Sequence, residues 1–394
     1  MRVLVADDDP VCRHLLVRTL QSWSYEVTAA TNGLEAWKAF EERDYPLVIL
    51  DWVMPGVDGL ELVRRIRSCS RPGYVFTLLL AASNDHDEFI QGLAAGADDF
   101  MVKPLDREEL RVRLRSGERI LKLEQTLVEQ NRLLKERNQE MEADLRMACE
   151  VQQALLPQGY PSFPRGVPPE RSRLRFCDRY YPNGAVGGDF FDVLPISDFM
   201  AGVFICDVMG HGVRAALGTA MVRVLLEGFR HVGDDPAAFL EGMNRDLLTI
   251  LGQASVPVFL SAFYATIDLK TNTIRYANAG HPTPICVRGS EARVLPLAGD
   301  HPGPPLGVRS QATYATIQGQ ALPGDRFIFY TDGLIEANNP QQELFGQERL
   351  RDAVCSRQAV ECSRLFDEIL AEVGRFTQGR GFADDVCLVG VDIR

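Results

Sequence analysis

Four acidic clusters in the second half of the chain have the residue types of a metal site. The clusters are Gly187-Gly188-Asp189, Asp207-Val208-Met209-Gly210-His211-Gly212, Thr331-Asp332-Gly333 and Asp384-Asp385. Apolar runs typical of strands lie beside Asp207, Asp332 and Asp385, and strand ends hold side chains rigidly enough to build a site. Carboxylates gathered from distant segments suit two hard divalent cations around one water. The alternative is a set of unconnected carboxylates on surface loops.

A second set of charged residues follows apolar runs near the other end of the chain. Asp7 and Asp8, then Asp51, then Lys103 with Pro104 stand at the ends of such runs. The runs alternate with amphipathic helical patterns up to about residue 115, which predicts a doubly wound, flavodoxin-like α/β sheet. The expected strands are 3–6, 47–50, 76–82 and 100–102, and the expected helices are 11–20, 33–40, 60–66 and 88–94. Ligands bind at the carboxyl ends of strands in such sheets, so one site is expected, unless the charges merely fringe an unrelated sheet.

Three motifs contain these charged residues: Val5-Ala6-Asp7-Asp8-Asp9, Leu50-Asp51-Trp52-Val53-Met54-Pro55-Gly56-Val57-Asp58-Gly59 and Gly96-Ala97-Asp98-Asp99-Phe100-Met101-Val102-Lys103-Pro104. Through them, residues 1–115 resemble the receiver domain of two-component response regulators. The resemblance implies that Asp7, Asp8 and Asp51 hold Mg²⁺. It also implies that Asp51 accepts a phosphoryl group from a sensor histidine kinase, while Lys103 steadies the resulting acyl phosphate.

One switch position departs from the pattern of the receiver family. Counting back from Lys103, the hydroxyl switch falls on Ala81, whose side chain cannot hydrogen-bond a phosphoryl oxygen. Ser83 lies two residues further on and is the alternative if the loop is shifted. Phe100 occupies the aromatic switch position of the family. Phosphorylation is therefore expected to shift the population of states only weakly.

A long helix, residues 116–157, is expected after the receiver segment. Apolar residues recur every seven positions along it: Ile120, Leu127, Leu134, Met141, Ala148 and Leu155. Leu123 and Val151 support a second seam position. A helix this long and polar needs a partner in water, which predicts a parallel homodimeric coiled coil. The second seam position is weakened by Gln130, Arg137 and Asp144. The alternative is a solvated linker helix packed along one domain, and Pro157 ends the helix in either case.

Residues 158–394 mix strand and helix patterns without regular alternation, which predicts an α+β sandwich of antiparallel sheets flanked by helices. The expected strands are 203–206, 259–267, 274–277, 326–330 and 386–391, and the expected helices are 213–229, 236–248 and 347–353. The motifs of this region are Gln152-Gln153-Ala154-Leu155-Leu156-Pro157, Val186-Gly187-Gly188-Asp189-Phe190-Phe191-Asp192, Asp207 to Gly212, Asn278-Ala279-Gly280-His281-Pro282 and Tyr330-Thr331-Asp332-Gly333-Leu334-Ile335-Glu336-Ala337. They resemble the bacterial stage-II-sporulation-E-like branch of the metal-dependent PP2C phosphatases.

This second resemblance implies a role for each acidic cluster. Asp207 would bridge two metal ions with help from the Val208 carbonyl, and Asp189 would bind one of them directly or through water. Asp332 and Asp384 would complete the shell of the other ion. Two Mn²⁺ or Mg²⁺ ions suit a shell made only of oxygen atoms, and they would activate a water for in-line attack on phosphorus.

Three further residues of these motifs have open roles. Asp385 is the alternative to Asp384 as a ligand. His211 is either a general acid for the leaving serine oxygen or a structural residue of a tight turn. His281, before Pro282, is better explained as a loop histidine with satisfied hydrogen bonds than as a catalyst.

Together the resemblances imply a response regulator whose phosphorylation at Asp51 controls a metal-dependent protein serine/threonine phosphatase. The coiled coil would transmit a change in packing to the helix formed by 152–156, beside the metal site. The implied substrate is a phosphorylated anti-sigma antagonist, in partner-switching control of a sigma factor. The same domain order also resembles RssB-type adaptors, which capture a stress sigma factor for proteolysis without catalysis. Because all four acidic positions are occupied, an active enzyme is preferred.

Composition excludes other classes of protein. With 394 residues, of which 46% are hydrophobic and 24% charged, the chain should form two or three globular domains. A net charge of -12 argues against nucleic acid as a partner. The apolar runs fall short of the roughly 20 residues that a membrane span needs, so no membrane partner and a cytoplasmic location are expected. Nine cysteines without a C-x-x-C pair are expected to be reduced thiols.

Overall fold

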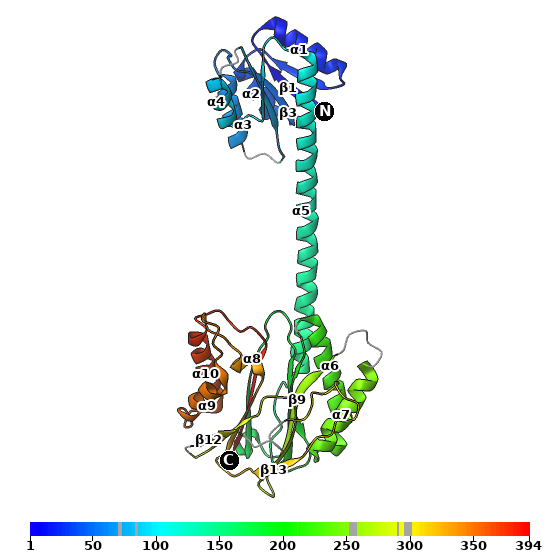
Figure 1. Cartoon of the computed structure of the whole chain (residues 1–394), viewed down its shortest axis with the longest axis vertical. Helices are drawn as coiled ribbons and strands as arrows, with labels where there is room; N and C mark the ends of the chain where they lie inside the picture. The colour runs from blue at the N-terminus through cyan, green and yellow to red at the C-terminus, as the bar shows by residue number, and fades with distance from the viewer. Residues whose placement is uncertain (70–72, 83–85, 211, 252–257, 290, 295–301) are drawn as a thin grey trace. The chain divides into compact units, whose positions relative to one another are not determined.

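The computed structural model describes the chain except for residues 70–72, 83–85, 211, 252–257, 290 and 295–301 (Figure 1). The chain divides into two compact units, Met1–Gln139 and Glu140–Arg394. Within the described residues, none of the helices has both the length and the apolar character that crossing a bilayer requires.

The first unit is built around a parallel five-stranded sheet in the order β2-β1-β3-β4-β5. Its strands are β1 (Arg2–Ala6), β2 (Glu26–Ala30), β3 (Leu47–Asp51), β4 (Phe76–Ala81) and β5 (Asp99–Val102). β3 and β4 are buried along their whole length, as apolar strands of a sheet covered on both faces should be. The register pairs Ala6 with Leu50, so the carboxyl ends of β1 and β3 lie side by side. The predicted doubly wound α/β sheet is confirmed.

Helices cover both faces of this sheet. They are α1 (Pro10–Ser22), α2 (Gly33–Glu42), α3 (Gly59–Ser68), α4 (His86–Ala94) and the first part of α5 (Arg107–Leu155). Leu16 and Leu20 of α1 share one core cluster with Leu110, Leu114 and Leu121 of α5. Residues of α2 and α3 pack in a second cluster, on the opposite face of the sheet.

Helix α5 begins at Arg107, before the boundary that the sequence places at residue 116. Gly117 lies against the Phe76 ring, because a Cβ at this glycine would stand 2.7 Å from Phe76 Cδ1. Leu121, about one turn further on, is 4% exposed in the same core. The first turns of the predicted linker therefore belong to the core of the first unit.

The seven-residue series of α5 has an exposed part and a covered part. Leu127, Leu134 and Met141 are 53%, 58% and 63% exposed within one chain. At 3.6 residues per turn they lie roughly opposite Leu121, which packs on the sheet. Leu155 instead packs against a core cluster of the second unit. The exposed residues thus form an apolar stripe that a second helix could cover. Leu155, the last residue of the series, is instead covered by its own chain.

The second unit is a sandwich of two antiparallel five-stranded sheets (Figure 1). The first sheet has the order β13-β10-β9-β8-β7, formed by β13 (Ile317–Gln320), β10 (Thr273–Ala279), β9 (Leu260–Asp268), β8 (Met200–Val208) and β7 (Asp189–Pro195). The other has the order β12-β11-β14-β15-β6, formed by β12 (Glu291–Val294), β11 (Ile285–Arg288), β14 (Arg326–Tyr330), β15 (Val386–Ile393) and β6 (Leu174–Tyr181). Phe191 and Ile205 of the first sheet share a core cluster with Phe329 and Val389 of the other.

Helices cover the outer faces of the sandwich. α6 (Val213–Gly228) and α7 (Pro236–Leu251) pack on the first sheet, while α8 (Asp332–Ile335), α9 (Gly346–Cys355) and α10 (Cys362–Phe376) pack on the other. Side chains alternate along β7, so Phe190 points toward α6 and α7 whereas Phe191 points between the sheets. Asp189, two residues before Phe191, is therefore on the inner side. The predicted α+β sandwich is confirmed.

The expectation that all nine cysteines are reduced thiols is wrong for one pair. Cys177 of β6 and Cys362 at the start of α10 form a disulfide, with their Cα atoms 6.5 Å apart. The other seven cysteines are not in disulfides. The two paired residues are separated by 185 positions, so only the packing of α10 beside β6 brings them together. Their spacing in the sequence gives no signal of the pairing.

Candidate functional site

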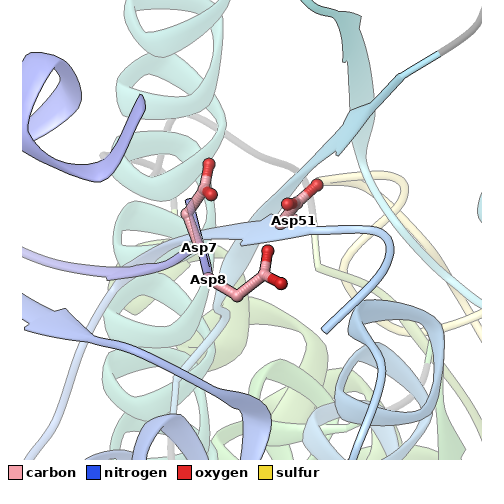
Figure 2. Close-up of side chains that lie close together, drawn as sticks. All are labelled: Asp7, Asp8 and Asp51. Atoms are coloured by element: carbon pink, nitrogen blue, oxygen red, sulfur yellow. The ribbon is translucent and has the colours of Figure 1, made fainter. Parts of the chain in front are cut away.

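The first predicted site lies at the carboxyl ends of β1 and β3 (Figure 2). Asp7 directly follows β1 and is fully buried, Asp51 ends β3 and is 7% exposed, and Asp8 is exposed. One carboxylate oxygen from each of these residues lies within 4.8 Å of the other two. Hard oxygen ligands at this spacing are what Mg²⁺ prefers.

Lys103, just after β5, joins this group. Its Nζ lies 2.7 Å from Asp51 Oδ2 and 3.0 Å from Asp7 Oδ2. Burial raises the pKa of Asp51; the hydrogen bond from Lys103 opposes the rise, and the charges of Asp7 and Asp8 add to it. One ammonium group thus serves a cluster of three carboxylates. The remaining negative charge fits a divalent cation at this position.

Local hydrogen bonds fix the turn that carries Asp7 and Asp8. The Asp9 N–H donates to Asp7 Oδ1 at 2.9 Å, and the Asp9 carboxylate accepts the N–H groups of the residues that begin α1. Arg13 donates from Nη1 to the Asp7 carbonyl at 2.6 Å. Asp9 is therefore a helix cap. Arg13, which the sequence reasoning missed, supports the site from the second turn of α1.

The two predicted switch positions lie on β4 and β5. Ala81 ends β4, is fully buried, and accepts the Lys103 N–H on its carbonyl at 2.8 Å. Phe100 of β5 is 6% exposed and packs in the core cluster that α2 and α3 cover. Ser83, the alternative hydroxyl, lies outside the described residues. Ala81 thus contributes a backbone group to the strand end beside Asp51, and no hydroxyl.

The second predicted site starts from a row of residues across the first sheet of the sandwich. Asp189 of β7 faces Asp207 of β8, which in turn faces Ser261 of β9. Directly opposed residues of antiparallel strands point to the same face, so Asp189 and Asp207 are neighbours. Asp332 begins α8, two residues after the end of β14, and Asp384 lies two residues before β15. The charges of Asp332 and Asp384 both act on Asp207.

Burial and mutual repulsion raise the pKa values of these carboxylates. Burial raises the pKa of Asp207 to about 7, and the charges of Asp332 and Asp384 contribute to the rise. Burial, and then the charge of Asp207, raise the pKa of Asp189, whereas a hydrogen bond from Thr331 opposes the rise. A cluster of buried carboxylates that hold protons in this way fits divalent cations, whose charge would offset the repulsion.

The two acidic sets differ in how closely their oxygens approach. Among the described residues, only Asp7, Asp8 and Asp51 place three ligand atoms within 4.8 Å of one another. Asp189 and Asp207 are direct cross-strand partners, and Asp332 and Asp384 act on Asp207 through their charges. The assignment of the second set as metal ligands stays a prediction.

Gly188 explains how the Val208 carbonyl comes close to the second set. A Cβ at Gly188 would lie 2.6 Å from the Val208 oxygen and 3.2 Å from Asp207 Oδ1. Only glycine lets the loop before Asp189 approach the end of β8 this closely. The backbone oxygen of Val208 and the carboxylate of Asp207 therefore border the same small region.

The neighbouring residues Asp384 and Asp385 have different environments. Asp385 is 3% exposed, and its carboxylate accepts the N–H of Gly188 and, at 2.5 Å, the N–H of Asn183. Asp384 is exposed and accepts the Asp385 N–H at 2.8 Å. These contacts favour Asp384 as the ligand, because Asp385 is engaged in shaping the loop before Asp189.

Sequence reasoning gave no individual role to two polar residues of this region. Thr331 Oγ1 donates to Asp189 Oδ2 at 2.7 Å and accepts the Cys387 N–H at 2.8 Å. Gln152 of α5 donates from Nε2 to the Gly187 carbonyl at 2.6 Å, and its Oε1 accepts the Gly187 N–H at 3.0 Å. Both residues lie inside motifs that carry the resemblance, which was the available signal. His211 lies outside the described residues.

Known proteins match the first unit. Residues 3–115 match the family model of the response regulator receiver domain. The phosphate regulon transcriptional regulatory protein PhoB of Rhizobium meliloti (strain 1021) is 37% identical over 115 residues, which are 29% of this chain and 51% of that protein. The transcriptional regulatory protein AruR of Pseudomonas aeruginosa is 42% identical over 114 residues, which are 28% of this chain and 46% of that protein. The chain thus spans about half the length of these curated relatives.

Known proteins also match the second unit. The SiaA-PP2C domain of Pseudomonas aeruginosa superposes with a TM-score of 0.55 at 20% identity, covering 66% of this chain and 99% of that domain, which shows a PP2C-like fold. Residues 197–394 match the family model of stage II sporulation protein E (SpoIIE). Because this match covers half of the chain, the protein belongs to the stage II sporulation protein E family and carries a response regulator receiver domain at residues 3–115.

Proposed function

We propose that this protein is a response regulator in which phosphorylation of Asp51 controls a metal-dependent protein serine/threonine phosphatase formed by residues 158–394. The observation that carries the proposal is the pairing of Asp189 with Asp207 across β7 and β8, inside a group of mutually repelling carboxylates. Membership of the SpoIIE family supports the same activity.

The phosphatase site would use oxygen atoms alone. Asp207 and the Val208 carbonyl would hold two Mn²⁺ or Mg²⁺ ions together with Asp189, Asp332 and Asp384. When bound, such a pair of cations supplies an activated water and neutralises phosphoryl charge. The residues around the site fix its geometry, since Thr331 holds Asp189 and Asp385 holds the loop before it.

The receiver site would accept the controlling signal. A carboxylate oxygen of Asp51 would attack the phosphorus of a phosphohistidine on a sensor kinase, with Asp7 and Asp8 as further Mg²⁺ ligands. Lys103 already contacts Asp51 and would move with the acyl phosphate as its counter-charge. Because Ala81 offers no hydroxyl to the phosphoryl group, the two receiver states should differ by only a few contacts.

Helix α5 is the route by which we expect the signal to reach the phosphatase. Gln152 binds both backbone groups of Gly187, and its Nε2 lies 3.2 Å from Thr219 Oγ1 of α6. The end of α5 therefore contacts both the loop before Asp189 and the helix that follows the Asp207 motif. A change in how two α5 helices pack along Leu127 would shift Gln152 relative to Gly187.

The proposed substrate is phosphoserine or phosphothreonine on a small anti-sigma antagonist, so the outcome would be partner-switching control of a sigma factor. Family membership and the domain order support this substrate class. The receiver unit would accept its phosphoryl group on Asp51, an aspartate, so the two units would act on different phosphorylated side chains. A phosphorylated antagonist is therefore the substrate to test first.

The proposal is tested on the full chain by measuring the dephosphorylation of a phosphorylated antagonist in Mn²⁺. The measurement is made with and without acetyl phosphate, which phosphorylates the receiver. Asp207→Asn should lower release by more than the roughly 10- to 100-fold typical of losing an outer-shell partner. Asp51→Ala should keep the basal release and lose the response to acetyl phosphate. The exposed Asp198 supplies the control, and Asp198→Asn should behave as wild type.

Two results would count against this function. Equal phosphate release by the wild type and Asp207→Asn would remove the metal site from the chemistry. Capture of a sigma factor without added metal, and without phosphate release, would instead support the RssB-type adaptor.

A further inference from the structure

We propose that His281 and Ser261 form a positioning pair between the two sheets. The pair fixes β9, whose neighbour β8 carries the ligand Asp207, relative to the end of β14, which leads to the ligand Asp332. The proposal rests on the phosphatase function above. It assigns a role to the motif 278–282, which the metal ligands leave unexplained. Neither residue of the pair needs to touch substrate, because the pair acts through the strands beside it.

The motif builds a loop that turns the His281 ring into the protein. The His281 N–H donates to Asn278 Oδ1 at 2.8 Å, and Asn278 Nδ2 donates to the His281 carbonyl at 2.9 Å. Gly280, between them, has a φ of +76°, and a Cβ there would lie 2.9 Å from Pro305 Cγ. His281 is 3% exposed. The loop thus fixes the ring inside the fold and does not display it to solvent.

One side of the ring meets β9 at the level of Asp207. His281 Nδ1 lies 2.7 Å from Ser261 Oγ. Ser261 faces Asp207 across β8 and β9, and residues opposed in this way have Cβ atoms about 4.5–5.5 Å apart on the same face. The hydrogen bond therefore fixes the side chain that is the immediate neighbour of the Asp207 carboxylate.

The other side of the ring faces the strand that leads to Asp332. The Tyr330 backbone interacts with the imidazole, although Nε2 has no partner of good geometry among the described residues. Tyr330 ends β14, and the next residue, Thr331, donates to Asp189. One buried ring thus lies between the two strands at the point where the ligands of both sheets begin.

The ring acts as a neutral hydrogen-bonding group. Burial lowers the pKa of His281 to about 3, and the Tyr330 backbone only partly opposes this. Near neutral pH the imidazole is therefore uncharged, which favours a hydrogen-bonding role over that of a general acid. The neutral ring carries one N–H, and its Nδ1 shares a hydrogen bond with the Ser261 hydroxyl.

Calorimetric titration of Mn²⁺ into the metal-free full chain measures positioning separately from catalysis. Ser261→Ala and His281→Leu should each weaken Mn²⁺ binding by about 10-fold, the lower end of the range for outer-shell partners. The double variant should bind no more weakly than His281→Leu alone, because the two residues act as one pair. His281→Asn keeps an amide group near the Nδ1 position and should recover most of the affinity.

Ser172→Ala is the matched control. Ser172 is also buried in the second unit, where it bonds to Phe163 and Leu174, so its loss should not change Mn²⁺ affinity. The proposed pair would be wrong if folded Ser261→Ala bound Mn²⁺ as tightly as the wild type. It would also be wrong if the losses of Mn²⁺ affinity in the two single variants added up in the double variant. If His281→Leu does not fold, the Mn²⁺ affinities of Ser261→Ala and Ser172→Ala are compared instead, and only Ser261→Ala should bind more weakly than the wild type. A wild type that neither binds Mn²⁺ nor releases phosphate would remove the phosphatase function, and the pair with it.

Discussion

At the scale of single residues, the balance of charge distinguishes the two acidic sites. The receiver carboxylates have Lys103 within 3.0 Å, and three of their oxygens lie close together. In the second set, burial and the charges of Asp332 and Asp384 raise the pKa of Asp207, so that its carboxyl group holds a proton more readily. The two sites therefore differ in their counter-charge: Lys103 offsets part of the negative charge of the first, whereas the second set repels itself.

The adjacent residues Asp384 and Asp385 can be tested for two different roles. We expect Asp384 to be a metal ligand and Asp385 to hold the loop before Asp189. Asp385→Asn should lower the thermal stability of the metal-free protein, because losing charged hydrogen bonds to the Gly188 and Asn183 amides costs about 1–3 kcal/mol. Asp384→Asn should leave that stability unchanged and weaken Mn²⁺ binding. Thermal unfolding in EDTA and calorimetric titration separate the two effects. The opposite pattern, with Asp384→Asn unstable and Asp385→Asn defective only in binding, would exchange the two roles.

At the scale of elements, the sequence predicts best those strands that are continuous apolar runs. β3 and β4 are such runs, and both were predicted. β2 and β6 were missed, because they lie at sheet edges and have mixed exposure, with no long apolar run to reveal them. α10 was missed although Leu365, Phe366 and Ile369 recur at helical spacing, so that signal was present.

The candidate sites show the same division between what a motif reveals and what only packing reveals. Motif residues such as Asp51 and Lys103 could be placed in one site from their positions at strand ends. The contact of Gln152 with Gly187 could not, because it joins residues 35 positions apart through the packing of α5 on the second unit. The shared position of Ser261 and Asp207 likewise depends on strand register, which apolar patterns do not specify.

Gly117 tests how α5 is joined to the receiver. On an exposed helix, replacing glycine by alanine gains about 1 kcal/mol. Here the new Cβ would lie 2.7–2.9 Å from three ring atoms of the buried Phe76, and overpacking of this kind costs about 1–3 kcal/mol. Gly117→Ala should therefore lower the urea midpoint of the receiver. All three tryptophans lie in the receiver, so tryptophan fluorescence follows this unit alone.

The control for Gly117 is an exposed position of the same helix. Gln130→Ala should leave the urea midpoint of the receiver unchanged. A higher midpoint for Gly117→Ala than for the wild type would mean that helix propensity outweighs the contact with Phe76. In that case the first turns of the linker would not be fixed to the receiver core.

At the scale of the whole molecule, the exposed stripe of α5 decides whether the protein works as a dimer. Leu127 and Leu134 are more than half exposed in one chain, and burying one leucine contributes about 1.5–3 kcal/mol. Replacing both by aspartate would place like charges across a parallel seam, so the variant should sediment as a monomer at concentrations where the wild type is a dimer. Lys135→Asp also introduces an aspartate, but on the outer face of the same turn, and should leave the dimer intact. A wild type that is monomeric at micromolar concentration would favour the solvated linker helix, and the signal from Asp51 would then have to travel along a single α5.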